Sequence, residues 1–114
     1  MHLNTNLRHI KSKEEHKELI EKNEKAVVVC GRMGPMCVPV YGIMEALREK
    51  HPDIAFTDML FDIRDAEVIR NLPECRQFRG LPFTIYYRNG KVVKATSSIQ
   101  SAKDVKAIIS EVFA

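Results

Sequence analysis

The sequence predicts an α/β fold in which a mixed central β-sheet of four to five strands carries helices on both faces. Two observations predict this fold. In the first half, apolar β-branched segments alternate with segments of helical spacing, and this alternation requires right-handed crossovers between parallel strands. In the second half, two strand-like segments flank a tight turn and an amphipathic segment follows. That pattern is typical of an antiparallel hairpin covered by a helix.

The N-terminal part predicts a short strand and a polar helix. The strand covers about residues 7–10. Ser12 followed by Glu15 is a capping box, in which the two side chains satisfy free backbone N–H groups where a helix begins. The helix should therefore begin just after Ser12 and run to about Asn23.

Two continuous apolar segments predict buried strands. They are AVVVC at residues 26–30 and IAFTDMLFDI at residues 54–63, and both suit strands covered on two faces. Asp58 is an awkward residue inside the second segment. Between the two strands, apolar residues recur at helical spacing from Val40 onward, and Pro52 ends this helix because proline cannot continue its hydrogen bonds.

The second half predicts two helices with a hairpin between them. The first helix begins at about residue 65 and is interrupted at Pro73. The hairpin turns at Asn89-Gly90, a pair that readily adopts the positive φ angles of a type I′ turn. Ser101 and Asp104 then open a C-terminal helix with a continuous apolar stripe.

The composition indicates one globular domain, residues 1–114. The chain is 45% hydrophobic and 29% charged, and its net charge of +3 is spread rather than clustered, which argues against nucleic acid as a partner. No apolar run reaches the ~18 residues that span a bilayer, so no membrane partner is expected. The first residues lack the apolar core of a signal peptide, and the cysteine count is odd. Both features favour the cytoplasm.

Three landmarks occur in a characteristic order. An apolar strand leads into Gly34-Pro35 and a helix; RGLPF follows at residues 79–83; and YYRNGKVV closes the sheet before a terminal helix. Together they resemble the thioredoxin family over nearly the whole chain. The resemblance implies a thioredoxin-like fold in which the Leu81-Pro82 peptide bond is cis and Pro82 faces the Gly34-Pro35 turn. About five extra residues before Pro82 imply a longer third helix.

The chemistry departs from that family. Thioredoxins use Cys-Gly-Pro-Cys, in which one thiolate attacks a disulfide and the second resolves the mixed disulfide. Aligning the Gly-Pro turn places Met33 and Met36 on the two cysteine positions. Aligning Cys37 with the second cysteine instead places Gly34 on the nucleophile position. The first alignment is preferred because it keeps the turn intact, and neither alignment contains a dithiol.

A second departure concerns the proton relay. The buried aspartate that serves as the relay in thioredoxins falls on Val27 or Val28. Because both the paired thiols and the relay are missing, classical dithiol oxidoreductase activity is not expected. Whether the protein is an enzyme of another kind stays open.

Cys37 is the candidate catalytic residue. We expect it in the first turn of the second helix, where peptide dipoles favour a thiolate, so a single activated thiol could exchange with glutathione or with Cys75. The alternative is that Cys37 is a small apolar residue under the loop. Cys30 is expected in the core. A minor hypothesis is Cu(I) binding through Met33, Met36 and Cys37, since soft sulfur ligands select that ion.

The function is therefore predicted to be either protein or peptide binding or a single-cysteine redox role. The candidate binding residues are Met33, Gly34, Pro35, Met36, Leu81 and Pro82. In thioredoxins the backbone before the cis-proline pairs with an extended segment of the bound protein, a mode that needs no cysteine. No cofactor and no resident metal are indicated, the partner is a protein or peptide, and the oligomeric state stays open.

Overall fold

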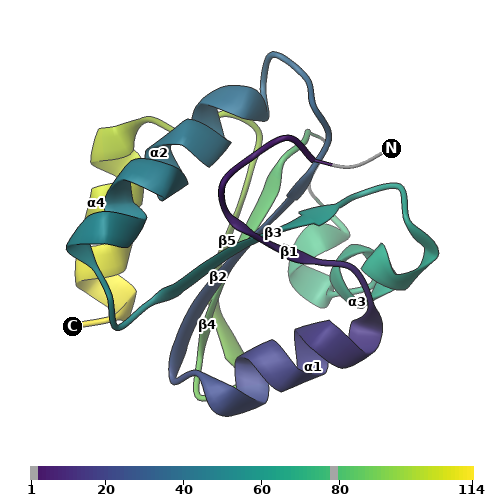
Figure 1. The fold of residues 1–114 in the computed structure, drawn as a ribbon, viewed down its shortest axis with the longest axis horizontal. Helices are drawn as coiled ribbons and strands as arrows, with labels where there is room; N and C mark the ends of the chain where they lie inside the picture. The colour runs from purple at the N-terminus through teal and green to yellow at the C-terminus, as the bar shows by residue number, and fades with distance from the viewer. Residues whose placement is uncertain (1–2, 78–79) are drawn as a thin grey trace.

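The computed structural model describes residues 3–77 and 80–114 (Figure 1). Within these residues, five strands form one sheet in the order β1-β3-β2-β4-β5. β1, β3 and β2 are mutually parallel, whereas β4 runs antiparallel to β2 and β5 antiparallel to β4. The predicted mixed sheet is confirmed. The strands are β1 (Arg8–Ile10), β2 (Lys25–Gly31), β3 (Ala55–Leu60), β4 (Phe83–Arg88) and β5 (Lys91–Ser97).

Helices cover both faces of the sheet, as predicted (Figure 1). The α-helices of the described residues are α1 (Lys13–Lys22), α2 (Val38–Lys50), α3 (Glu67–Arg70) and α4 (Ala102–Val112). On one face, Val27 and Val29 of β2 pack in a core cluster with residues of α2 and α4. On the other face, Val28 and Cys30 pack with residues of α1 and α3. In the described part of the chain, no helix combines the length and the apolarity needed to cross a membrane.

The turn and helix caps form where the sequence predicts them, but the capping box predicted at Ser12 is only half made. The Ser12 hydroxyl caps α1 by accepting from the Glu15 N–H at 3.1 Å, although the Glu15 carboxylate bonds the N–H of Lys11 rather than that of Ser12. Ser101 caps α4 with the full reciprocal capping box. Asn89 and Gly90 have φ angles of 54° and 80°, as a type I′ turn requires.

The prediction of a longer third helix is wrong. The segment instead contains a 3₁₀ turn (Arg64–Ala66), the single-turn α3 and a second 3₁₀ turn (Pro73–Cys75). Proline forces the residue before it out of the helical region, and Leu72 is accordingly extended, with φ −63° and ψ 138°. The extra residues are therefore used in separate short turns. Arg79 of the RGLPF segment lies outside the described residues.

Candidate functional site

The Gly34-Pro35 turn joins β2 to α2 and is closed by backbone hydrogen bonds. The N–H groups of Cys37 and Val38 both donate to the Gly34 carbonyl, at 3.1 and 3.0 Å. Cys37 directly precedes α2 as its N-cap residue, one position before the first helical turn in which we expected it. Pro39 lies in that turn without cost, because the first helical N–H groups have no partner within the helix.

The sulfur atoms of this region face opposite ways. The side chains of Met33 and Met36 are 43% and 44% exposed, whereas Cys37 is only 3% exposed and belongs to the core on the α2 side. The Met33 Sδ accepts a hydrogen bond from the backbone N–H of Asn4 at 3.3 Å. The structure thus exposes the two methionines and buries the cysteine, so the three proposed copper ligands do not share one environment.

Gly31, at the end of β2, is the point at which three elements meet. A Cβ atom at this position would lie 2.8 Å from the Tyr41 hydroxyl, 2.9 Å from the Cys37 Sγ and 3.0 Å from the Pro82 Cβ. Because side-chain carbons essentially never come that close, only glycine fits. The position therefore sets how α2 and the proline loop approach β2.

Hydrogen bonds hold this junction together. The Tyr41 hydroxyl donates to the Arg32 carbonyl at 3.0 Å, and the Arg32 N–H donates to the Cys37 Sγ at 3.5 Å. The Leu81-Pro82 peptide bond is cis, and the Pro82 carbonyl accepts from the Ser98 N–H at 3.0 Å. The structure therefore brings Cys37 and Pro82 to the same place beneath the turn.

The other two thiols are poorly suited to redox chemistry. Burial raises the pKa of Cys30 to about 12, with a further contribution from nearby Cys75, and burial raises the pKa of Cys75 to about 11. Both thiols stay protonated at neutral pH, and the thiol is a weak nucleophile compared with the thiolate. Cys75 packs in the core on the α1 side, on the other face of the sheet from Cys37, so the structure does not bring the two together.

Arg32 is a residue of the site that sequence reasoning missed. Its guanidinium makes two hydrogen bonds to the Asp62 carboxylate, at 2.7 and 2.8 Å, and lies 5.4 Å from the centre of the Phe61 ring. The arginine holds the pKa of Asp62 below its usual range. Exposed ion pairs contribute little stability, but two-point contact fixes the arginine beside the turn. No local pattern links residues 30 positions apart.

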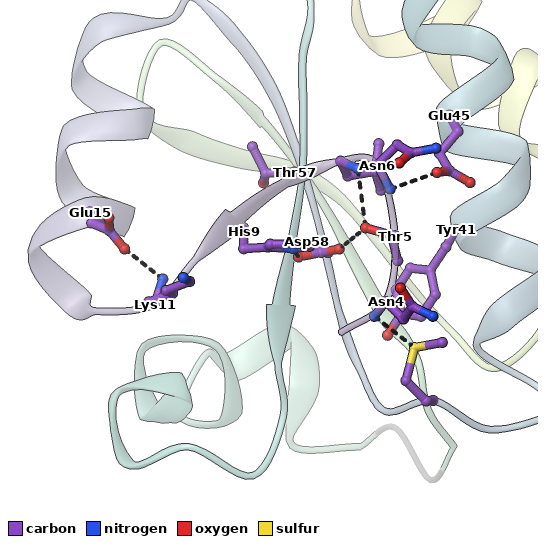
Figure 2. A network of polar contacts seen from close by, with 12 residues as sticks. Asn4, Thr5, Asn6, His9, Lys11, Glu15, Tyr41, Glu45, Thr57 and Asp58 are labelled. Atoms are coloured by element: carbon purple, nitrogen blue, oxygen red, sulfur yellow. Dashed lines mark hydrogen bonds and ion pairs between the residues drawn. The ribbon is translucent and has the colours of Figure 1, made fainter. Parts of the chain in front are cut away.

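Asp58 is the second missed feature, and its place in the strand is explained by its partners. The side chain is fully buried; one carboxyl oxygen accepts from the Thr5 hydroxyl, and the other lies 2.6 Å from His9 Nδ1 (Figure 2). Phe56 and Leu60 pack on the α2 side, so Asp58 between them faces the same side. Burial raises the pKa of Asp58, while the hydrogen bonds from Thr5 and His9 oppose that rise.

The segment of residues 3–7 connects these features. Thr5 binds Asp58, and Leu3 and Leu7 pack in the core on the α2 side. The Asn6 N–H donates to the Glu45 carboxylate of α2 at 2.7 Å (Figure 2), and Arg48 donates back to the Asn6 carbonyl. The segment therefore crosses α2 and reaches the turn at Met33.

Solved structures of thioredoxins resemble this chain closely in fold. Plasmodium falciparum thioredoxin matches with a TM-score of 0.75 and 19% identity, over 93% of this chain and 99% of its own. Mitochondrial thioredoxin 3 from Saccharomyces cerevisiae matches with 0.75 and 18%, over 93% and 95%. Arabidopsis thaliana thioredoxin O2 matches with 0.75 and 13%, over the whole of both chains.

The sequence comparisons add no further relative. No protein-family model matches the chain, and no curated protein sequence matches it significantly. The structural likeness confirms that the chain has the thioredoxin fold. Its chemistry must be argued from its own residues, because a fold does not determine a function.

The crowding at Gly31 predicts a large and local cost of substitution. Gly31→Ala should lower the free energy of unfolding by about 1–3 kcal/mol, because neither the buried Tyr41 nor Pro82 can move away. Urea denaturation followed by circular dichroism measures it. Gly42→Ala is the matched control: it lies within α2 with nothing inside 4 Å, and should stabilise by up to about 1 kcal/mol. Equal effects of the two variants would contradict the crowding.

The buried carboxyl predicts a pH-dependent stability. Because the pKa of Asp58 is raised, its protonated form is favoured in the folded protein; this stabilisation is complete below about pH 4 and is lost as the pH rises through the raised pKa. In Asp58→Asn, which keeps partners for Thr5 and His9, the stability relative to wild type should therefore increase with pH. Urea denaturation between about pH 4 and neutral measures it.

Asp62→Asn is the control for the direction in which stability changes with pH. The pKa of Asp62 is lowered, so its stabilisation is present above about pH 4 and is lost as the pH falls. The stability of Asp62→Asn relative to wild type should therefore decrease with pH. If the two variants changed with pH in the same direction, the assignment for Asp58 would be wrong.

Proposed function

We propose that this protein is a peptide-binding module that uses the Gly34-Pro35 turn and the Leu81-Pro82 loop, without dithiol chemistry. One observation carries the proposal: at the turn, Met33 and Met36 face solvent while Cys37 is buried. Exposed apolar side chains that gather in one place mark binding surfaces. A thiol that acts on other proteins must instead be reachable.

The chemistry of the exposed side chains favours a peptide partner. Met33 and Met36 flank the turn, and the exposed Val38 extends the same apolar region at the start of α2. Methionine is flexible and polarisable, so it adapts to varied apolar side chains. An extended peptide that pairs with the backbone before Pro82 would place its side chains over this region.

The thiols support a non-catalytic role in a reducing compartment. All three cysteines are free and buried. Free cysteines are typical of the cytoplasm, where we place the protein. Exchange through Cys37 with glutathione would require the side chain to leave its contacts with Gly31 and Arg32. Peptide binding requires no such rearrangement.

A peptide titration tests the proposal. Extended peptides of about six to eight apolar residues, added to ¹⁵N-labelled protein, should shift the amide resonances of Gly34, Met36 and Leu81 in a saturable manner. Met33→Ser combined with Met36→Ser should weaken binding about tenfold or more, because the apolar contact area is lost.

Val93→Ser is the matched control for that titration. Val93 is similarly exposed, at 41%, but lies on β5 away from the turn, so its substitution should leave the affinity unchanged. Equal losses in both variants, or shifts that avoid the turn and the proline loop altogether, would contradict the proposal.

A reductase assay tests the claim that dithiol chemistry is absent. With dithiothreitol as reductant, the wild-type protein should not accelerate insulin reduction, because no second thiol can resolve a mixed disulfide. Met33→Cys combined with Met36→Cys should raise the rate at least about tenfold over wild type, since it restores paired thiols at exposed positions. Activity in the wild type that Cys37→Ser abolishes would instead support the single-cysteine role.

A further inference from the structure

A pocket of about 300 Å³ opens where β1 and β3 end, on the side of the sheet that residues 3–7 cross. It is lined by Leu3, His9, Lys11, Asp58, Leu60 and Ile63, among others. Of the turn and proline-loop residues that the structure describes, none lines the pocket, so it is separate from the proposed peptide site. Its size is at the lower end of the range for small-molecule pockets.

The orientation of His9, a polar residue that lines the pocket, is fixed by the buried Asp58. Asp58 is fully buried, and both of its carboxyl oxygens are occupied, one by Thr5 and the other by His9 Nδ1. A carboxyl bound to one ring nitrogen fixes the orientation of an imidazole and the role of its other nitrogen. The His9 side chain is 31% exposed, and in the described part of the chain its Nε2 has no partner.

The protonation state of the Asp58–His9 pair decides whether His9 Nε2 donates or accepts a hydrogen bond. When the Asp58–His9 pair holds two protons, one lies between the carboxyl and Nδ1 and the other is on Nε2, which then donates a hydrogen bond. Thr5 donates to the same carboxyl, and the negative charge of Glu45 in α2 contributes to the raised pKa of Asp58. The pair is then neutral overall, so it does not repel an anion.

Lys11 adds a positive charge at the rim of the pocket. Its side chain is exposed and, within the described residues, makes no ion pair. The carboxylate of Glu15 in α1 accepts from the Lys11 backbone N–H and does not line the pocket. Among the described residues, the one acid that lines the pocket is Asp58, whose oxygens are already occupied. When the Asp58–His9 pair holds two protons, the charges of this pair and of Lys11 suit an anion and not an amine.

We propose that this pocket binds a small organic carboxylate with a short hydrocarbon part. In the two-proton state of the Asp58–His9 pair, the carboxylate would accept hydrogen bonds from His9 Nε2 and Lys11 Nζ, and the hydrocarbon part would pack against Leu3, Leu60 and Ile63. An apolar wall with a few convergent polar groups is the usual composition of such sites. Charge-assisted hydrogen bonds are the stronger kind, so the two donors should determine which ligands bind.

Hexanoate is the probe for the test, with hexanamide and hexylamine as neutral and cationic controls of the same chain length. Added to the ¹⁵N-labelled full chain, hexanoate should shift the amide resonances of Lys11, Leu60 and Ile63 in a saturable manner. Hexanamide and hexylamine should bind about tenfold more weakly or not at all. No saturable shift with hexanoate, or equal binding of all three, would overturn the proposal.

Two variants test whether His9 and Lys11 bind the carboxylate of hexanoate. His9→Gln and Lys11→Met should each weaken hexanoate binding about tenfold, and Lys11→Met leaves the Asp58 contacts intact, so it stays informative if His9→Gln disturbs the fold. His51→Gln and Lys50→Gln, at the end of α2, are the matched controls and should bind hexanoate as wild type does. If Lys11→Met had no effect, or if the controls weakened binding equally, the assigned pocket would be wrong.

Discussion

The close approach at Gly31 is the constraint on which the arrangement of the site depends. The Tyr41 hydroxyl, the Cys37 sulfur and the Pro82 ring all lie within 3.0 Å of the position that a side-chain carbon would occupy there. They belong to α2, to the residue before it and to the loop before β4. A single glycine lets these three pack against β2. The thiol at this junction is buried, whereas the neighbouring Met33 and Met36 are exposed.

Asp58 has a comparable role on β3. Buried polar groups must be satisfied, and among the described residues this carboxyl is satisfied by Thr5 and His9, which lie 53 and 49 positions earlier in the chain. The carboxyl therefore joins the three-residue strand β1 and the segment before it to β3. The same contacts set the orientation of His9, so one buried group contributes both to the fold and to the polar wall of the pocket.

Local chemistry explains which features could be predicted from the sequence. Asn89-Gly90 and the Ser101 capping box depend on neighbouring residues, and both form as expected. The third helix was wrongly predicted because the extension of Leu72 before Pro73 divides the segment into short turns. The partners of Asp58 and the inward direction of Cys37 depend on residues distant in the sequence or on the missing side chain of Gly31, and no local pattern records either.

The two borders of the sheet bear on the tendency of the protein to aggregate. β1 has only three residues, and β5 carries an irregularity in its pairing near Tyr86 and Tyr87, with exposed Lys91 and Lys94 along it. Short, bulged and lysine-bearing edges resist the addition of strands from other molecules. Uncontrolled cross-β stacking is therefore disfavoured at both borders, and the protein is guarded against polymerising along its own sheet.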